Sequence, residues 1–140
     1  MSHFNWPVRV YYEDTDAGGV VYHASYLRFF ERARTEWLRA AGFNQSLLHE
    51  QNIVFVVSEL SIKYVRPARL DAELDVQLNI QAVKKASLQF LQLIYDKQQN
   101  LIAQAEVRVA CLKADTLKPC AIPPVILTSV TASLEEKSGE

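Results

Sequence analysis

The stretch VRVYYEDTDAGGVVYHASYLRFFERARTEWLRAAG, residues 8–42, decides the fold. It begins with the period-two alternation that is typical of a β-strand and breaks at an acidic, glycine-containing turn over residues 13–19. It then continues past His23 as a long amphipathic helix. The turn therefore joins a strand to the start of a helix, and we expect the chemistry at this junction.

The predicted helix has one apolar face and one charged face. At about 100° per residue, one broad arc holds the apolar side chains of Tyr26, Leu27, Phe29, Phe30, Ala33, Trp37, Leu38, Ala40 and Ala41. Arg34 falls inside this arc, so we expect its side chain either to extend to solvent or to pair with Glu31. Gly42 suits the position that ends a helix. So wide an apolar face needs a sheet to pack on.

The rest of the chain is predicted to form that sheet. Alternation or apolar runs between turn residues predict strands at residues 6–12, 53–65, 71–82, 87–95 and 101–112. Asn44 can cap a short second helix that carries Leu47 and Leu48. We therefore expect an α+β domain over residues 1–128, in which a curved antiparallel sheet made of successive hairpins wraps around one long helix.

The C-terminal region and the sheet edge give two further expectations. After Pro119, the chain is expected to wind over the surface and to end in a disordered tail at residues 129–140. One wet sheet face and a long edge strand invite extension of the sheet by a second copy, so we expect a homodimer.

Composition excludes several classes of protein. The 15 basic and 16 acidic residues give a net charge of -1, which argues against a general binder of nucleic acid or anionic membranes. No apolar run approaches the roughly 20 residues of a membrane span, and the N-terminal residues resemble no signal peptide. We therefore expect a cytoplasmic protein. Cys111 and Cys120 show no metal or redox spacing, so we expect two reduced thiols.

The turn before the helix carries the candidate chemistry. Gly18 and Gly19 allow a tight turn that can bring the Asp16 carboxylate and the His23 imidazole together. The first backbone N–H groups of the helix, at His23 and Ala24, have no partner within the helix and carry the positive end of its dipole. A carboxylate, a histidine and free N–H groups resemble the parts needed for hydrolysis of an acyl group.

Each candidate also has a structural interpretation. Acidic residues before a helix most often cap it or complement its dipole, and Asp-Ala-Gly-Gly is an ordinary turn composition. Asp14, Asp16 and His23 could be imagined as metal ligands, but no usual ligand spacing is present. Tyr12 shares the face of Val8 and Val10 and is more often a core residue than a catalytic one.

Residues 9–39, RVYYEDTDAGGVVYHASYLRFFERARTEWLR, resemble the signature of hotdog-fold acyl-CoA thioesterases of the 4-hydroxybenzoyl-CoA thioesterase superfamily. More narrowly, they resemble the bacterial Tol-Pal-associated branch, often called YbgC. The likeness continues through FVVSELSIKYVRPARLDAELDV, the KKAS turn, AEVRVACL and AIP, so it covers nearly the whole chain.

The resemblance implies a hotdog fold, homodimers that can pair again, and hydrolysis of acyl-CoA thioesters with neither metal nor cofactor. It assigns the catalytic aspartate to Asp16, the motif histidine to His23 and a tyrosine of the site to Tyr12. The oxyanion donor of the family corresponds to the backbone N–H at His23. Lys84 and Lys85 resemble a basic pair that contacts the coenzyme in relatives. Without the resemblance, the two lysines are most simply interpreted as a solvated hairpin turn.

Two other classes of function remain open from the sequence. One is a hotdog hydratase or dehydratase that acts on acyl-CoA or acyl-carrier-protein substrates. The other is a non-enzymatic module that binds acyl-carrier protein or a partner in the envelope machinery. For every class we expect a location in the cytoplasm, with a peripheral place at the inner membrane as the alternative. Release of free thiol separates hydrolysis from both.

Overall fold

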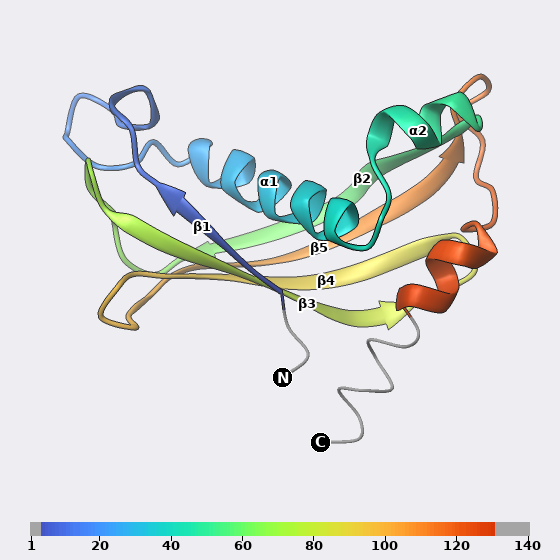
Figure 1. The fold of residues 1–140 in the computed structure, drawn as a ribbon. Coiled ribbons are helices and arrows are strands. Elements are labelled where there is room, and N and C mark those ends of the chain that lie inside the picture. Colours follow the sequence, from blue (N-terminus) through green and yellow to red (C-terminus); the bar gives the residue numbers. More distant parts are fainter. Residues whose placement is uncertain (1–3, 131–140) are drawn as a thin grey trace, which may run out of the picture.

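The computed structural model describes residues 4–130, in which one long helix lies across one face of a curved antiparallel sheet (Figure 1). The labelled helices are α1 (Ser25–Ala40) and α2 (Gln45–Glu50), and a 3-10 turn spans Tyr12–Asp14. The strands are β1 (Phe4–Arg9), β2 (Ile53–Tyr64), β3 (Glu73–Val83), β4 (Ser87–Tyr95) and β5 (Leu101–Lys113). The predicted α+β class and the wrapping of sheet around helix are confirmed.

The strand order differs in one respect from successive hairpins. The sheet runs β1-β3-β4-β5-β2, so β3, β4 and β5 form the two expected hairpins while β2 crosses to the far edge and pairs with β5. The connection that follows β2 is held against the loop before α1, because the Val21 N–H donates to the Ala68 carbonyl at 2.8 Å. Within the described chain, the outer edge of β2 pairs with no strand.

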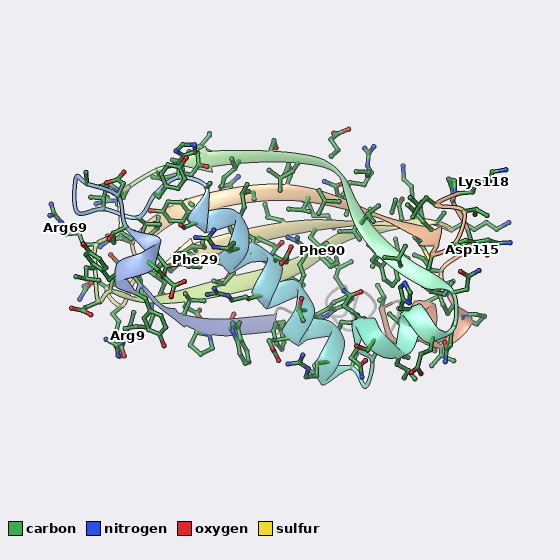
Figure 2. All side chains as sticks on the ribbon, turned by 90° about the horizontal axis from the view of Figure 1, so that it is seen from above. Arg9, Phe29, Arg69, Phe90, Asp115 and Lys118 are labelled. Atoms are coloured by element: carbon green, nitrogen blue, oxygen red, sulfur yellow. The ribbon has the colours of Figure 1, made fainter. Side chains whose placement is uncertain are left out.

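The core lies between α1 and the inner face of the sheet. The predicted alternation of β3 is confirmed, because its inward residues are all buried: Leu74, Val76, Leu78 and Ile80. Phe29, Phe30 and Ala33 of α1 have no exposed surface, and Trp37 meets the Phe90 ring edge-on at 5.4 Å. Figure 2 looks down on α1 where it crosses the strands. Each buried phenylalanine stabilises the packing by about 1.5–3 kcal/mol.

Arg34 has a partner that the helix pattern could not indicate. Its guanidinium donates to Gln92 Oε1 at 2.9 Å, and Gln92 Nε2 donates to the Phe30 carbonyl at 3.0 Å. Burial lowers the pKa of Arg34, an effect that the negative charge of Glu31 opposes. Gln92 occupies an inward position of β4 and is fully buried, so it holds the arginine inside the apolar arc.

The end of the first strand and the exposure of three helix residues differ from the predictions. β1 ends at Arg9 rather than at Tyr12, because the buried Asp14 carboxylate accepts the Tyr11 N–H at 2.8 Å and turns the chain. Tyr12 is therefore 83% exposed instead of buried. At α1, three residues that were placed on the apolar arc are exposed: Leu27, Ala40 and Ala41. Gly42 follows the helix with φ +96°, as expected for a C′ residue.

The C-terminal region is more ordered than its prolines indicated. Residues 124–130 form a helix, drawn in orange-red in Figure 1, and bury Ile126 and Val130. This helix includes residues 129 and 130 of the predicted tail, and residues 131–140 lie outside the described residues. Between residues 4 and 130, no helix has both the length and the apolar character needed to cross a membrane.

The two cysteines lie close together although nine positions separate them. Both are free thiols, and the Sγ atoms of Cys111 and Cys120 are 3.7 Å apart. The Cys120 N–H donates to the Cys111 carbonyl, which aligns the chain after β5 with that strand. The pKa of Cys111 is raised to about 12, mainly by burial and to a smaller extent by the neighbouring Cys120.

Candidate functional site

Asp14 anchors the loop that leads into α1. Its buried carboxylate accepts the Tyr11 N–H, while its backbone carbonyl accepts the Tyr22 N–H at 2.8 Å. Its second carboxylate oxygen lies 4.0 Å from the Arg28 guanidinium on the first turn of α1. Asp14 therefore connects both sides of the loop to the helix, which explains an acidic residue that the sequence left without a role.

Asp16 occupies the exposed tip of the same loop. The Gly19 N–H donates to its carbonyl at 3.0 Å, and its own N–H donates to the Val20 carbonyl at 2.9 Å. The Gly18 N–H donates to Asp16 Oδ1 at 2.8 Å, and a Cβ at Gly18 would lie only 3.2 Å from that oxygen. Gly19 has φ +81°, which favours glycine. The two glycines therefore orient a carboxylate that stays open to solvent.

The N-terminus of α1 leaves backbone donors without partners in the described chain, among them those of His23 and Ala24. The Ser25 N–H donates to the Tyr22 carbonyl at 2.8 Å, and Leu27 N–H donates to the Ala24 carbonyl at 3.2 Å. Within residues 4–130, the N–H groups of His23 and Ala24 have no acceptor, and Ala24 offers no side-chain cap. These are the predicted oxyanion donors, reinforced by the positive end of the helix dipole.

The His23 side chain is exposed beside these donors. Its ring lies 4.5 Å from the Tyr22 ring and 6.4 Å from the Tyr64 ring, measured between centroids. Among the described residues, its imidazole makes no hydrogen bond, and none joins it to Asp16. One chain thus places the predicted carboxylate and histidine on the same loop without a hydrogen bond between their side chains.

Tyr64, at the end of β2, is a residue that sequence reasoning missed. Its hydroxyl donates to the backbone carbonyl of His23 at 2.9 Å, across 41 positions of sequence. Its ring packs 5.5 Å from that of Tyr26, whose own hydroxyl accepts the Ala68 N–H at 3.2 Å. A hollow of about 270 Å³ opens here, lined by Val21, His23, Tyr26, Tyr64, Val65, Arg66 and Pro67. Sequence spacing gives no signal for this contact, because it depends on how β2 crosses the sheet.

The other predicted site residues lie apart from this hollow. Tyr12 projects into solvent, and no hydrogen bond in the described chain joins its hydroxyl to Asp16. Lys84 and Lys85 form the β3–β4 turn, at the opposite end of the sheet from the loop before α1 (Figure 1). β3 itself extends about 33 Å at about 3.3 Å per residue, so the lysines and His23 of one chain are remote from each other.

A larger cavity borders α1 and β2 farther along the helix. It encloses about 530 Å³, and most of its lining is apolar, including Trp37, Leu38, Phe55 and Phe90. Glu31 and Arg34 supply the charged part of its wall. The hollow at His23 also borders α1 and β2, so both spaces lie along the same helix and the same edge strand.

No cluster of three or more potential metal-ligating side chains occurs in residues 4–130.

A helix laid across a curved antiparallel sheet, with a carboxylate loop leading into its open N-terminus, defines a hotdog-fold domain of the thioesterase type. A family model described as the thioesterase-like superfamily matches residues 10–130. The chain belongs to this superfamily and, within it, to the YbgC family, and is therefore an enzyme of the thioesterase class.

The relatives that support this assignment cover most of the chain. The acyl-CoA thioester hydrolase YbgC of Escherichia coli O6:H1 is 50% identical over 124 residues, which are 89% of this chain and 92% of the relative. The acyl-CoA thioesterase YbgC of Haemophilus influenzae is 51% identical over 121 residues, 86% and 88% of the two chains. The DHNA-CoA thioesterase from Staphylococcus aureus has a TM-score of 0.90 at 20% identity, covering 99% of this chain and 95% of that chain, which shows the shared fold.

Proposed function

We propose that this chain hydrolyses acyl-CoA thioesters to a carboxylic acid and free coenzyme A, with Asp16 as the catalytic carboxylate and without a metal ion. The proposal is based on the loop before α1. This loop holds the exposed Asp16 carboxylate and leads directly to the backbone N–H groups of His23 and Ala24, which lack acceptors in the described chain. The curated relatives at 50% and 51% identity support the substrate class, because both are named for hydrolysis of acyl-CoA.

The backbone donors would stabilise the transition state. The thioester carbonyl oxygen binds at the N–H groups of His23 and Ala24, where negative charge develops as the carbonyl carbon becomes tetrahedral. A lost donor of this kind typically lowers the rate about 10²–10³-fold. The positive end of the α1 dipole acts in the same direction.

Asp16 would supply the attacking group by one of two routes. In the first route, Asp16 acts as a general base and takes a proton from water, whose oxygen attacks the carbonyl carbon. In the second, the Asp16 carboxylate attacks the carbonyl carbon directly and forms a mixed anhydride, which water then hydrolyses. In both routes the carbon–sulfur bond breaks and coenzyme A leaves as a thiolate. His23 is placed to orient the water or the carbonyl and to protonate that thiolate. No step requires a Lewis acid.

A second copy of the chain would complete the site. Within the described chain, the 12 residues of β2 have a free outer edge, which is suited to pair with another strand. Large apolar side chains are exposed on or near this edge and the adjoining end of α1: Leu27, Val57, Tyr64 and Val65. Because no hydrogen bond or ion pair joins His23 to Asp16 in the described chain and Tyr12 is exposed, we propose that pairing of two β2 edges builds the complete site.

The coenzyme phosphates have two candidate partners. Arg66 lines the hollow at His23, and Arg69 lies in the same connection after β2, bridged to Val20. The side chains of Arg9 and Arg69 reach this end of the molecule in Figure 2. Lys84 and Lys85 are too distant to meet a coenzyme bound at His23 of the same chain, so a second copy would have to present them.

The acyl group would extend along α1 into the larger cavity. From Ser25 to Leu38 the helix rises about 20 Å at about 1.5 Å per residue, so the apolar walls at Trp37 and Leu38 can serve only an extended acyl chain. Short acyl groups would end beside Tyr26 and Tyr64 instead. We therefore expect hydrolysis to be more efficient for long acyl chains than for short ones.

The direct test follows free thiol with short-chain, long-chain and aromatic acyl-CoAs. Release that continues unchanged after treatment with a chelator supports hydrolysis without a metal. Absence of release above background for every substrate contradicts the proposed function. Free thiol with no addition of water across a double bond also separates hydrolysis from hydratase chemistry.

A further inference from the structure

Tyr64 is tied to the backbone of the candidate oxyanion site rather than to a side chain. Its hydroxyl donates to the carbonyl oxygen of His23 at 2.9 Å. That carbonyl belongs to the residue just before Ala24, which adjoins the first turn of α1. The interaction therefore joins the end of edge strand β2 to the start of α1, two segments that are far apart in the sequence.

The hydrogen bond to the His23 carbonyl also orients the Ala24 N–H, because the two groups belong to one planar peptide unit. The carbonyl of His23 and the N–H of Ala24 belong to one peptide unit, in which they point in opposite directions because the bond is trans and planar. Holding the carbonyl oxygen from one side therefore fixes the direction of the Ala24 N–H on the other. That N–H has no acceptor in the described part of the chain, so it is available to a ligand.

The Tyr64 ring is itself held in place before any ligand binds. It packs against Tyr26 at 5.5 Å and meets the His23 ring edge-on at 6.4 Å. Tyr26 is buried and fixed by the Ala68 N–H. A donor aligned in advance costs no reorganisation when charge develops, and donation to the carbonyl also polarises the peptide so that its N–H becomes a stronger donor.

We infer that Tyr64 is a positioning residue for catalysis, which aims the Ala24 N–H at the developing oxyanion through its hydrogen bond to the His23 carbonyl. The inference rests on the proposed thioester hydrolysis. Tyr64 itself donates to the protein backbone and contacts no reacting atom. Its hydroxyl is therefore needed for the orientation of a catalytic donor rather than for binding of the substrate.

Tyr64→Phe tests this role, because it removes the hydroxyl and keeps the ring contacts. We expect kcat to fall about tenfold, which corresponds to about 1.4 kcal/mol, while KM changes little, as for an interaction that matters only in the transition state. The melting temperature should stay close to that of the wild type, because the Tyr64 side chain is 45% exposed. Tyr95→Phe is the matched control, since it removes a hydroxyl from β4, and it should leave kcat unchanged.

An independent measurement reads the peptide group directly. His23-Ala24 is the only His-Ala pair in the sequence. Protein labelled with ¹³C at the histidine carbonyls and ¹⁵N at the alanine amides therefore gives a single peak in an HNCO spectrum, from this one peptide unit. Tyr64→Phe should shift that peak, and Tyr95→Phe should not.

The outcomes separate this inference from the proposed function. A tenfold lower kcat together with a shifted peak supports the positioning role. An active wild type whose Tyr64→Phe variant keeps its kcat, or raises only KM, refutes the positioning role and leaves hydrolysis standing. A wild type that hydrolyses no acyl-CoA refutes the proposed function, and with it any catalytic role of Tyr64.

Discussion

Asp14 and Asp16 lie two positions apart, and the structure predicts opposite consequences when each is changed to asparagine. The Asp14 carboxylate is buried, accepts the Tyr11 N–H at 2.8 Å and lies 4.0 Å from Arg28. Asp16 is exposed at the tip of the loop, and within residues 4–130 its carboxylate accepts only the Gly18 N–H. Asp14→Asn should therefore affect stability, and Asp16→Asn should affect catalysis.

The magnitudes follow from these contacts. A hydrogen bond to a charged acceptor contributes about 1.5–3 kcal/mol and one to a neutral acceptor about 0.5–1.5 kcal/mol, so Asp14→Asn loses about 1–1.5 kcal/mol at the Tyr11 N–H. The ion pair with Arg28 adds at most about 1 kcal/mol, because the arginine side chain is 55% exposed. For a chain of this size, the sum lowers the melting temperature by about 3–10 °C.

Asp16→Asn should leave the melting temperature nearly unchanged. The asparagine oxygen can still accept the Gly18 N–H, and an exposed substitution of this kind changes the free energy of unfolding by less than about 0.5 kcal/mol. Because the amide can neither accept a proton from water nor attack the thioester effectively, kcat should fall by about 10²–10⁴-fold.

Thermal melts and steady-state hydrolysis of one acyl-CoA, measured on the same preparations at one protein concentration, check both predictions. The fixed concentration matters because subunit association would itself shift the melting temperature. Equal losses of kcat from the two variants would refute the assignment of the chemistry to Asp16. A wild-type melting temperature for Asp14→Asn would refute the structural role of its buried carboxylate.

Three further predictions concern assembly, the coenzyme and the thiols. Light scattering should show a dimer or larger assembly under assay conditions, and an active monomer would contradict a site completed by pairing of β2 edges. Arg66→Ala and the double replacement of Lys84 and Lys85 by alanine should each raise KM for acyl-CoA, weaken its salt dependence and leave hydrolysis of an acyl-pantetheine unchanged. Equal effects on both substrates would locate the phosphates elsewhere. At pH 8, iodoacetamide should label Cys120 before Cys111, because a pKa of about 12 keeps Cys111 protonated and the thiolate is the reactive form. Mass spectrometry of the labelled protein checks the order, and labelling of Cys111 first would contradict the prediction.

Local patterns predicted most of the secondary structure. The alternation along β3 identified its buried face because side chains in a strand repeat with period two. Asn44 was predicted as a helix cap and indeed accepts the Leu47 N–H at 2.8 Å. The loop motif and the open helix N-terminus were likewise predicted from adjacent residues, and the structure brings them to one end of α1. These features depend on neighbours in the sequence, so a single sequence can reveal them.

Contacts between distant segments could not be predicted in this way. β2 pairs with β5 at the far edge of the sheet, and this crossing brings Tyr64 to His23. The same limitation concealed Gln92 as the partner of Arg34 and the 3.7 Å approach of the two cysteine sulfurs. In each case the residue type was visible in the sequence, but its partner was determined by the topology of the sheet.

The different environments of Asp14 and Asp16 arise from the 3-10 turn at Tyr12–Asp14. In a continuous strand, residues two positions apart lie on the same face, so Asp14 and Asp16 would share one environment. The turn interrupts that period, because the Asp14 N–H donates to the Tyr11 carbonyl at 2.9 Å while its carboxylate turns back to the Tyr11 N–H. The chain then reverses around Gly18 and Gly19, which leaves Asp16 outside. One acid is thus used to build the loop, and the other is left open to solvent, as the proposed catalytic role of Asp16 requires.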